Sequence, residues 1–135
     1  MTDLESATLQ AVAARQAITD QIYRYCRAMD RIDLALGYSV WHEDGTADYG
    51  DVFVGTGREF VDHVAIQHGQ LLVHSHQVTN IVIELDGDTA ASEAYVTASL
   101  RMERGGKLLQ MVVLSRYLDR WSKRAGPKPQ PRRRP

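Results

Sequence analysis

Hydrophobic and polar positions follow two periods along this chain of 135 residues, helical in the first half and strand-like in the second. Within residues 6–30, Ile18, Ile22 and Cys26 stand four residues apart and would form an apolar stripe on one side of a helix. The same stretch contains neither Gly nor Pro, the two residues that most disfavour a helix interior. The pattern therefore predicts a long N-terminal helix over 6–30.

Shorter elements should follow this helix. Asp33 is a suitable N-cap for a short helix over 34–41. Residues 46–54 have the composition of a strand or hairpin, and turn residues flank them on both sides. Residues 58–69 return to helical spacing and end at Gly69, a residue that commonly stops a helix.

The last third of the chain alternates as strands do. Three runs, 71–85, 89–104 and 107–123, are separated by Asp-Gly-Asp and Gly-Gly, which are good hairpin signals. Strands of this length should bend. Helices followed by antiparallel strands indicate an α+β fold, with the N-terminal helices packed on one face of a curved sheet. Such a sheet closed by helices makes a cone, and its interior is where a ligand cavity is expected.

The stretch "HSHQVTNIVIEL" places polar groups on one side of a strand. Because side chains alternate across a strand, one face is expected to carry His74, His76, Val78, Asn80 and Val82. Histidine and asparagine between valines suit the wall of a partly buried pocket better than a solvated surface. Alternatively, His76 is a hydrogen-bonded core histidine, and Asn80 satisfies local backbone groups.

Asp30 continues the apolar stripe of the first helix, because it follows Cys26 by four residues. A carboxylate on that stripe would face the interior, where an unpaired charge is costly. A histidine is a suitable partner, since a carboxylate fixes the ring tautomer and steadies the imidazolium. The pair could act as a general base. The alternative is that Asp30 only ends the helix.

Other chemistries have weaker signals. The sequence has no Gly-rich phosphate loop, nucleophile elbow or dinucleotide fingerprint. Cys26 lies in mid-helix on the apolar stripe and is expected to be inert packing. His74 and His76 could be two metal ligands, but the third candidates show no recognised spacing, and we expect neither a metal nor another cofactor. Those third candidates are His42, His63 and His68.

Charge is unevenly distributed along the chain. Residues 124–135 hold five basic residues and all four prolines, whereas the remainder carries 11 basic and 17 acidic residues. We therefore expect one domain over 1–123 and a disordered tail over 124–135. An acidic body argues against nucleic acid as a partner.

The remaining composition is that of an ordinary globular protein, 44% hydrophobic and 24% charged. A single cysteine excludes an intrachain disulfide and fits the cytoplasm, where we expect the protein to reside. No apolar run reaches the roughly 20 residues that cross a bilayer, and the polar N-terminus lacks the pattern of a secretory signal. We expect no membrane partner.

Taken in order, these features resemble the SnoaL-like branch of the nuclear-transport-factor-2-like (NTF2-like) superfamily. The resemblance covers residues 13–121 and rests on three features. These are the aspartate that ends the helix in "AITDQIYRYCRAMDRID", Trp41, and His-x-x-x-Asn before the turn in "HSHQVTNIVIELDGDTA". It implies the cone-shaped α+β fold of that superfamily, a cystatin-like roll.

Within the branch, the chain is similar to scytalone dehydratase and hexachlorocyclohexane dehydrochlorinase. Both remove a proton and expel a leaving group without a cofactor, so the resemblance implies a lyase or isomerase acting on a small hydrophobic cyclic substrate. It implies Asp30 and His76 as the catalytic pair. The substrate-binding residues it implies are Tyr25, Trp41, Tyr49, Asn80 and Tyr95.

The sequence departs from the family in places. No histidine lies near "SEAYV", and the proline-rich end stands where a last strand is usual. An unpaired sheet edge would invite association, and we expect a homo-oligomer, a dimer or trimer. A non-catalytic domain that binds a small ligand or another subunit is the alternative, since fold alone does not settle function.

Overall fold

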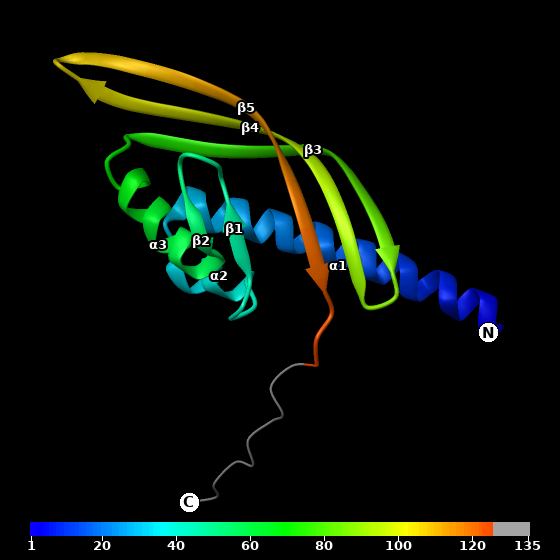
Figure 1. Ribbon diagram of the computed structural model, residues 1–135. Coiled ribbons are helices and arrows are strands. Elements are labelled where there is room, and N and C mark those ends of the chain that lie inside the picture. The colour runs from blue at the N-terminus through cyan, green and yellow to red at the C-terminus, as the bar shows by residue number, and fades with distance from the viewer. Residues whose placement is uncertain (126–135) are drawn as a thin grey trace, which may run out of the picture.

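A layer of helices covers one face of a three-stranded antiparallel sheet in the computed structural model of the chain, which describes residues 1–125 (Figure 1). The elements are α1 (Asp3–Arg31), α2 (Leu34–Ser39), β1 (Thr46–Asp48), β2 (Val54–Thr56), α3 (Gly57–His68), β3 (Val73–Asp86), β4 (Thr89–Arg104) and β5 (Lys107–Ser122). The sheet order is β3-β4-β5, and β1 pairs with β2 in a separate hairpin. The predicted α+β class is confirmed.

Helix α1 spans one side of the molecule and begins earlier than predicted. The Thr2 hydroxyl accepts from the Glu5 amide while the Glu5 carboxylate accepts from the Thr2 amide, a capping box that starts the helix at Asp3. The buried side chains of α1 are Ile22, Tyr25, Cys26, Ala28 and Met29. Among residues 1–125, no helix is both long and apolar enough to cross a membrane.

Aromatic side chains pack between the helices and the strands. Tyr49 stacks on Phe60 of α3 with ring centroids 4.0 Å apart, and Phe53 packs against the same ring at 5.2 Å. Tyr25 of α1 meets Tyr117 of β5 edge to face at 5.6 Å, which joins the first helix to the sheet. Each such pair adds about 0.5–1.5 kcal/mol beyond the burial of its area.

Strand β3 carries a bulge at its centre, where the predicted bending occurs. The register passes from Thr79 opposite Tyr95 to Val82 opposite Glu93, so β3 has one residue more than β4 between these two pairs. Asn80 lies in this extra stretch with φ of 54°. Asparagine visits this left-handed conformation more readily than most residues.

The bulge exchanges the two faces of β3. Beyond it, Val82 is 62% exposed and Ile83 is buried, whereas His76 before it faces the helices. The prediction that Asn80 and Val82 share a face with His76 is therefore wrong. The alternation was counted straight through the bulge, which shifts every later residue to the other side.

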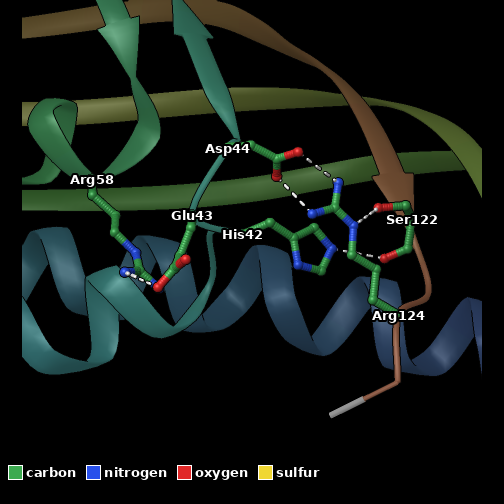
Figure 2. A network of polar contacts seen from close by, with 6 residues as sticks. All are labelled: His42, Glu43, Asp44, Arg58, Ser122 and Arg124. Atoms are coloured by element: carbon green, nitrogen blue, oxygen red, sulfur yellow. Dashed lines mark hydrogen bonds and ion pairs between the residues drawn. The ribbon is translucent and has the colours of Figure 1, made fainter. Parts of the chain in front are cut away.

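The end of β5 is fastened to the loop after α2, as Figure 2 shows. The His42 Nε2–H donates to the Ser122 carbonyl at 2.9 Å, and Arg124 pairs with Asp44 at 2.6 Å. The guanidinium of Arg124 holds the pKa of the Asp44 carboxyl below its ordinary value. The predicted disordered tail began at residue 124, but Arg124 contacts the body of the domain. Residues 126–135 of that tail lie outside the described residues.

Strand β5 forms one edge of the sheet within residues 1–125. Its first half exposes large apolar side chains, namely Leu108, Leu109, Met111, Val112, Val113 and Leu114. An edge of this kind can pair with another chain. The expected homo-oligomer stays a prediction.

Substitution of Asn80 should separate its backbone role from a chemical one. We expect Asn80→Ala to lower the free energy of unfolding by roughly 1–2 kcal/mol, the cost of a left-handed residue with a Cβ, and Asn80→Gly to lower it less. Urea denaturation of the two variants measures the difference. Equal losses in both would show that the Asn80 side chain, and not its φ, is what the bulge requires.

Candidate active site

Asp30 and His76 are in direct contact, although 46 residues separate them in the chain. Asp30 stands near the C-terminal end of α1, and its Oδ1 lies 2.6 Å from His76 Nδ1. Its Oδ2 accepts the backbone N–H of His76 at 3.0 Å. One carboxylate therefore binds both the ring and the backbone of the same residue. The contact expected between these two side chains is present.

This arrangement fixes the tautomer of His76. A carboxylate can only accept, so Nδ1 carries the proton in the short contact with Asp30. The neutral ring then holds its lone pair on Nε2. The side chains keep 11% and 25% exposure, for His76 and Asp30 respectively, so the pair is shielded without being sealed.

Two further histidines gather around this pair. His74 Nδ1 lies 4.0 Å from Asp30 Oδ1, and the ring of His68 lies 4.5 Å from that of His74 and 5.6 Å from that of His76. His68 Nδ1–H donates to the Met29 carbonyl at 3.3 Å, and burial lowers the pKa of His68, so its ring is neutral at neutral pH. The sequence singled out His68 only as a loose metal-ligand candidate. Within residues 1–125, no three His, Cys, Asp or Glu side chains are grouped to hold a metal ion.

Polar groups of three aromatic residues lie on the same side of the sheet. The hydroxyls of Tyr25 and Tyr49 are 2.7 Å apart, and Trp41 meets the Tyr25 ring edge to face at 6.2 Å. Burial raises the pKa of Tyr49 to about 12 and that of Tyr25 well above its ordinary value, so both remain protonated. Gly57 leaves room for the indole, because a Cβ there would lie 1.9 Å from the Trp41 ring.

Two buried nitrogens in this region lack a hydrogen-bond partner among the described residues. They are Trp41 Nε1 and His74 Nδ1. A buried N–H without an acceptor costs about 1–3 kcal/mol. Such groups are suited to meeting an oxygen atom of a bound molecule.

Asn80 and Tyr95 do not join the group around His76. Tyr95 is 54% exposed while its neighbours Ala94 and Val96 are buried, so it faces away from the helices. Both side chains line a groove of about 650 Å³ on the outer face of the sheet, with Val82 beside them. Placing Asn80 and Tyr95 in the substrate pocket is incorrect, because the bulge turns the first outward and the alternation of β4 turns the second outward.

Asp119 is a partly buried carboxylate that the sequence did not point to, and it is among the residues that line the groove of about 650 Å³. It lies opposite the buried Ser92 in the register of β4 and β5, and the indole N–H of Trp121, two residues on, donates to the Ser92 hydroxyl at 2.8 Å. Burial raises the pKa of Asp119 to about 6. The alternation of Tyr117, Asp119 and Trp121 along one strand was the signal that could have found it.

Cys26 is buried on α1, four residues before Asp30. Burial, together with the charges of Asp30 and Asp119, raises the pKa of its thiol to about 12. The thiol is therefore protonated and a poor nucleophile. The expectation that Cys26 is inert packing agrees with these surroundings.

The stability of the fold should reveal the raised pKa of Asp119. The folded carboxyl has a pKa of about 6 against an ordinary 3.8, so its stabilising contribution is present below pH 3.8 and is lost as pH rises through 6. We expect Asp119→Asn to raise the free energy of unfolding by roughly 2–3 kcal/mol at about pH 7.5, at about 1.4 kcal/mol per pKa unit. Urea denaturation between about pH 4 and pH 7.5 tests this expectation. A gain that does not shrink toward low pH would contradict it.

The chain matches a known protein family. The model of the SnoaL-like domain matches residues 10–127. No curated protein matches the chain.

Solved structures share the fold at low sequence identity. A putative scytalone dehydratase from Novosphingobium aromaticivorans superposes with a TM-score of 0.77 at 21% identity, covering 88% of this chain and 80% of that one. Hexachlorocyclohexane dehydrochlorinase LinA-type3 from Novosphingobium barchaimii gives 0.75 at 18% identity, covering 88% and 82%. An NTF2-like superfamily protein from Salmonella enterica gives 0.70 at 17% identity, covering 84% and 82%. These likenesses show a shared fold, and the family model shows that the chain belongs to the SnoaL-like family.

Proposed function

We propose that this protein is a cofactor-independent lyase that removes a proton beside a carbonyl group and expels a leaving group from the neighbouring carbon. The substrate class is small, hydrophobic and cyclic. One observation carries the proposal: the carboxylate of Asp30 accepts both the ring Nδ1–H and the backbone N–H of His76. That contact leaves Nε2 of His76 as a base of fixed orientation.

His76 is the general base of the reaction. Its Nε2 takes the proton from the carbon acid, and the ring becomes an imidazolium. Asp30, 2.6 Å from Nδ1, stabilises the positive charge that forms without itself taking the proton. A general base positioned in this way contributes about 10²–10⁴-fold to the rate.

Interior donors can bind the carbonyl oxygen of the substrate. Removal of the α-proton moves negative charge onto that oxygen, so donors aimed at it favour the transition state. Trp41 Nε1 is buried and has no acceptor among residues 1–125, and Tyr49 shares one hydrogen bond with Tyr25. Trp41 and Tyr49 are therefore assigned to orient and polarise the substrate.

The names of the solved relatives agree with this class of reaction. One relative is named as a dehydrochlorinase and another as a putative scytalone dehydratase, and each name applies to that relative alone. Their identity to this chain is 18% and 21%, which supports the fold. The assignment to this chain rests on the Asp30–His76 contact.

A domain that binds a small ligand or a subunit without turnover is the second candidate. The observation that favours it is the packing of the interior, where Tyr49, Phe53 and Phe60 stack closely while the groove of about 650 Å³ lies on the outer face. In that case Asp30 and His76 would serve to fix α1 against β3.

Exchange of α-protons isolates the first step of the proposed reaction. We expect the wild-type protein to accelerate the exchange of the α-protons of cyclohexanone with D₂O, followed by ¹H NMR. His76→Ala and Asp30→Asn should each lower this acceleration about 100-fold or more, because the base or its orientation is lost. Exposed His42 provides the control, and His42→Ala should retain the wild-type rate.

The two candidate functions give different results in this assay. Full exchange activity in His76→Ala would eliminate His76 as the base. Broadened ketone signals without exchange in the wild-type protein would favour the binding domain over the lyase.

A further inference from the structure

We infer that a second copy of this chain pairs with the first half of β5 about a two-fold axis at Met111, and that the partner strand completes the apolar wall of the site beside His76. The pairing itself follows from the sheet and requires no enzymatic activity. The role of the completed wall rests on the proposed function. The expected homo-oligomer is thereby assigned as a dimer with a defined interface.

The first half of β5 is an open edge of the sheet. Within residues 1–125 the strand order β3-β4-β5 gives β5 a strand neighbour on one side alone, and residues 107–115 are exposed throughout. Figure 1 shows the turn between β4 and β5 projecting past the helices. The other end of β5 is fastened to the loop after α2 through Ser122 and Arg124. The free backbone N–H and C=O groups of 107–115 are therefore a template for another strand.

Apolar side chains occupy both faces of this edge. Because side chains alternate along a strand, the inner face, which carries Tyr117 against Tyr25, also carries every second residue before it. The exposed apolar side chains are Leu109, Met111 and Val113 on the inner face and Leu108, Val112 and Leu114 on the outer face. An uncharged run of this kind without proline is prone to aggregation on an open edge unless a partner covers it. Lys107 and Arg116 flank the run and limit the pairing to it.

The run 108–114 is complementary to itself. A two-fold axis perpendicular to the sheet at Met111 places the run antiparallel to its own copy and keeps the inner faces of both copies on one side. Leu108 then lies opposite the partner's Leu114, and Leu109 lies opposite the partner's Val113. Met111 lies opposite the partner's Met111. Apolar side chains therefore face one another at the centre and at both ends of the run.

Neighbouring registers pair the run less well. An axis shifted by one residue toward the turn would set Leu114 opposite Gly106. An axis shifted by one residue the other way would set Leu108 opposite the charged Arg116. An axis at Met111 is the one that places the whole run opposite itself.

The register of the sheet connects this edge to the catalytic pair. His76 lies opposite Ala98 of β4, which in turn lies opposite Val113 of β5. Residues that lie opposite one another share a face, so Val113 stands on the inner face two strands from His76, at roughly 10 Å. Val113 and Met111 are nevertheless 38% and 45% exposed. The apolar wall that begins beside His76 therefore ends at an edge open to solvent.

A second copy extends this wall by one strand. Across the axis, the row of His76, Ala98 and Val113 continues with the partner's Leu109, and the row of His74, Leu100 and Met111 continues with the partner's Met111. Both added side chains are apolar and shield the open side of the wall. Exclusion of water strengthens the electrostatic interactions inside a site, so pairing should favour the proposed reaction.

The size of the interface predicts a reversible dimer. A fully exposed Leu, Val or Met side chain offers about 60–120 Å² of apolar surface. At the exposures of the six apolar residues, the edge offers roughly 200–400 Å² per copy, together with the backbone of 107–115. A standard stable interface buries about 800 Å² per partner. The dimer should therefore dissociate on dilution, with a Kd on the order of 1–100 μM.

Charges placed at the axis test the pairing. In sedimentation velocity of the full chain, we expect the wild-type protein to pass from monomer to dimer between about 1 μM and about 500 μM. Met111→Glu and Met111→Lys each set like charges opposite one another, so each should remain monomeric, whereas their equimolar mixture should dimerise. Leu118→Glu places a charge on the outer face of β5 beyond the run, and this control should dimerise like the wild-type protein.

A disulfide tests the register. Opposite Cα atoms of antiparallel strands lie about 4.5–5.5 Å apart, which a disulfide can bridge. Under mild oxidation Met111→Cys should therefore cross-link two copies on a non-reducing gel. Val113→Cys is the matched control on the same face of the same strand, and it should not cross-link, because it lies opposite the partner's Leu109. Cys26 is buried and does not compete.

The outcomes separate the dimer, the completed wall and the lyase. A wild-type protein that stays monomeric, a mixture of the two Met111 variants that stays monomeric, or a monomeric Leu118→Glu would each overturn the pairing at β5. In the α-proton exchange assay at high concentration, Met111→Glu should be about 10-fold slower per chain than the wild-type protein. Equal rates would overturn the role of the wall, with the dimer unaffected. Absence of exchange in a dimeric wild-type protein would overturn the lyase and the role of the wall, and leave the dimer standing.

Discussion

The carboxylate of Asp30 is the constraint on which the rest of the site depends. It accepts two N–H groups of His76, one from the ring and one from the backbone, and thereby fixes the end of α1 against the first half of β3. Removing one partner would leave a partly buried polar group without its hydrogen bond, which typically costs about 1–3 kcal/mol. The same contact that determines how helix and sheet meet also leaves the Nε2 of His76 as the basic atom.

Local patterns predicted the elements because each carries its own signal. The turns at Gly87 and Gly105-Gly106 have positive φ, which glycine adopts without strain, and the strands on either side begin and end within two residues of the predicted bounds. Asp30 was found for a similar reason, since one helix repeat from Cys26 decides which way it faces. Such patterns can be recognised from residues that are close together in the sequence.

The residues that were misplaced depend on partners far along the chain. Nothing within β3 shows that Asn80 adopts a positive φ, because the bulge is defined by the pairing of Thr79 and Val82 with β4. Asp119 was missed for the same reason. Its burial depends on how β5 lies against the rest of the domain. The contacts that hold the end of that strand, His42 with Ser122 and Asp44 with Arg124, each join residues 80 positions apart in the sequence.

The carboxylate at position 119 does not favour folding at neutral pH. Burial raises the pKa of Asp119 to about 6, so at neutral pH the ionised form is held at the expense of stability. Asparagine is nearly isosteric and would remove that expense. Groups whose burial shifts their pKa toward neutrality gather at functional sites, where a proton must be held and released. A structural role would tolerate substitution by asparagine, whereas a proton donor requires the acid.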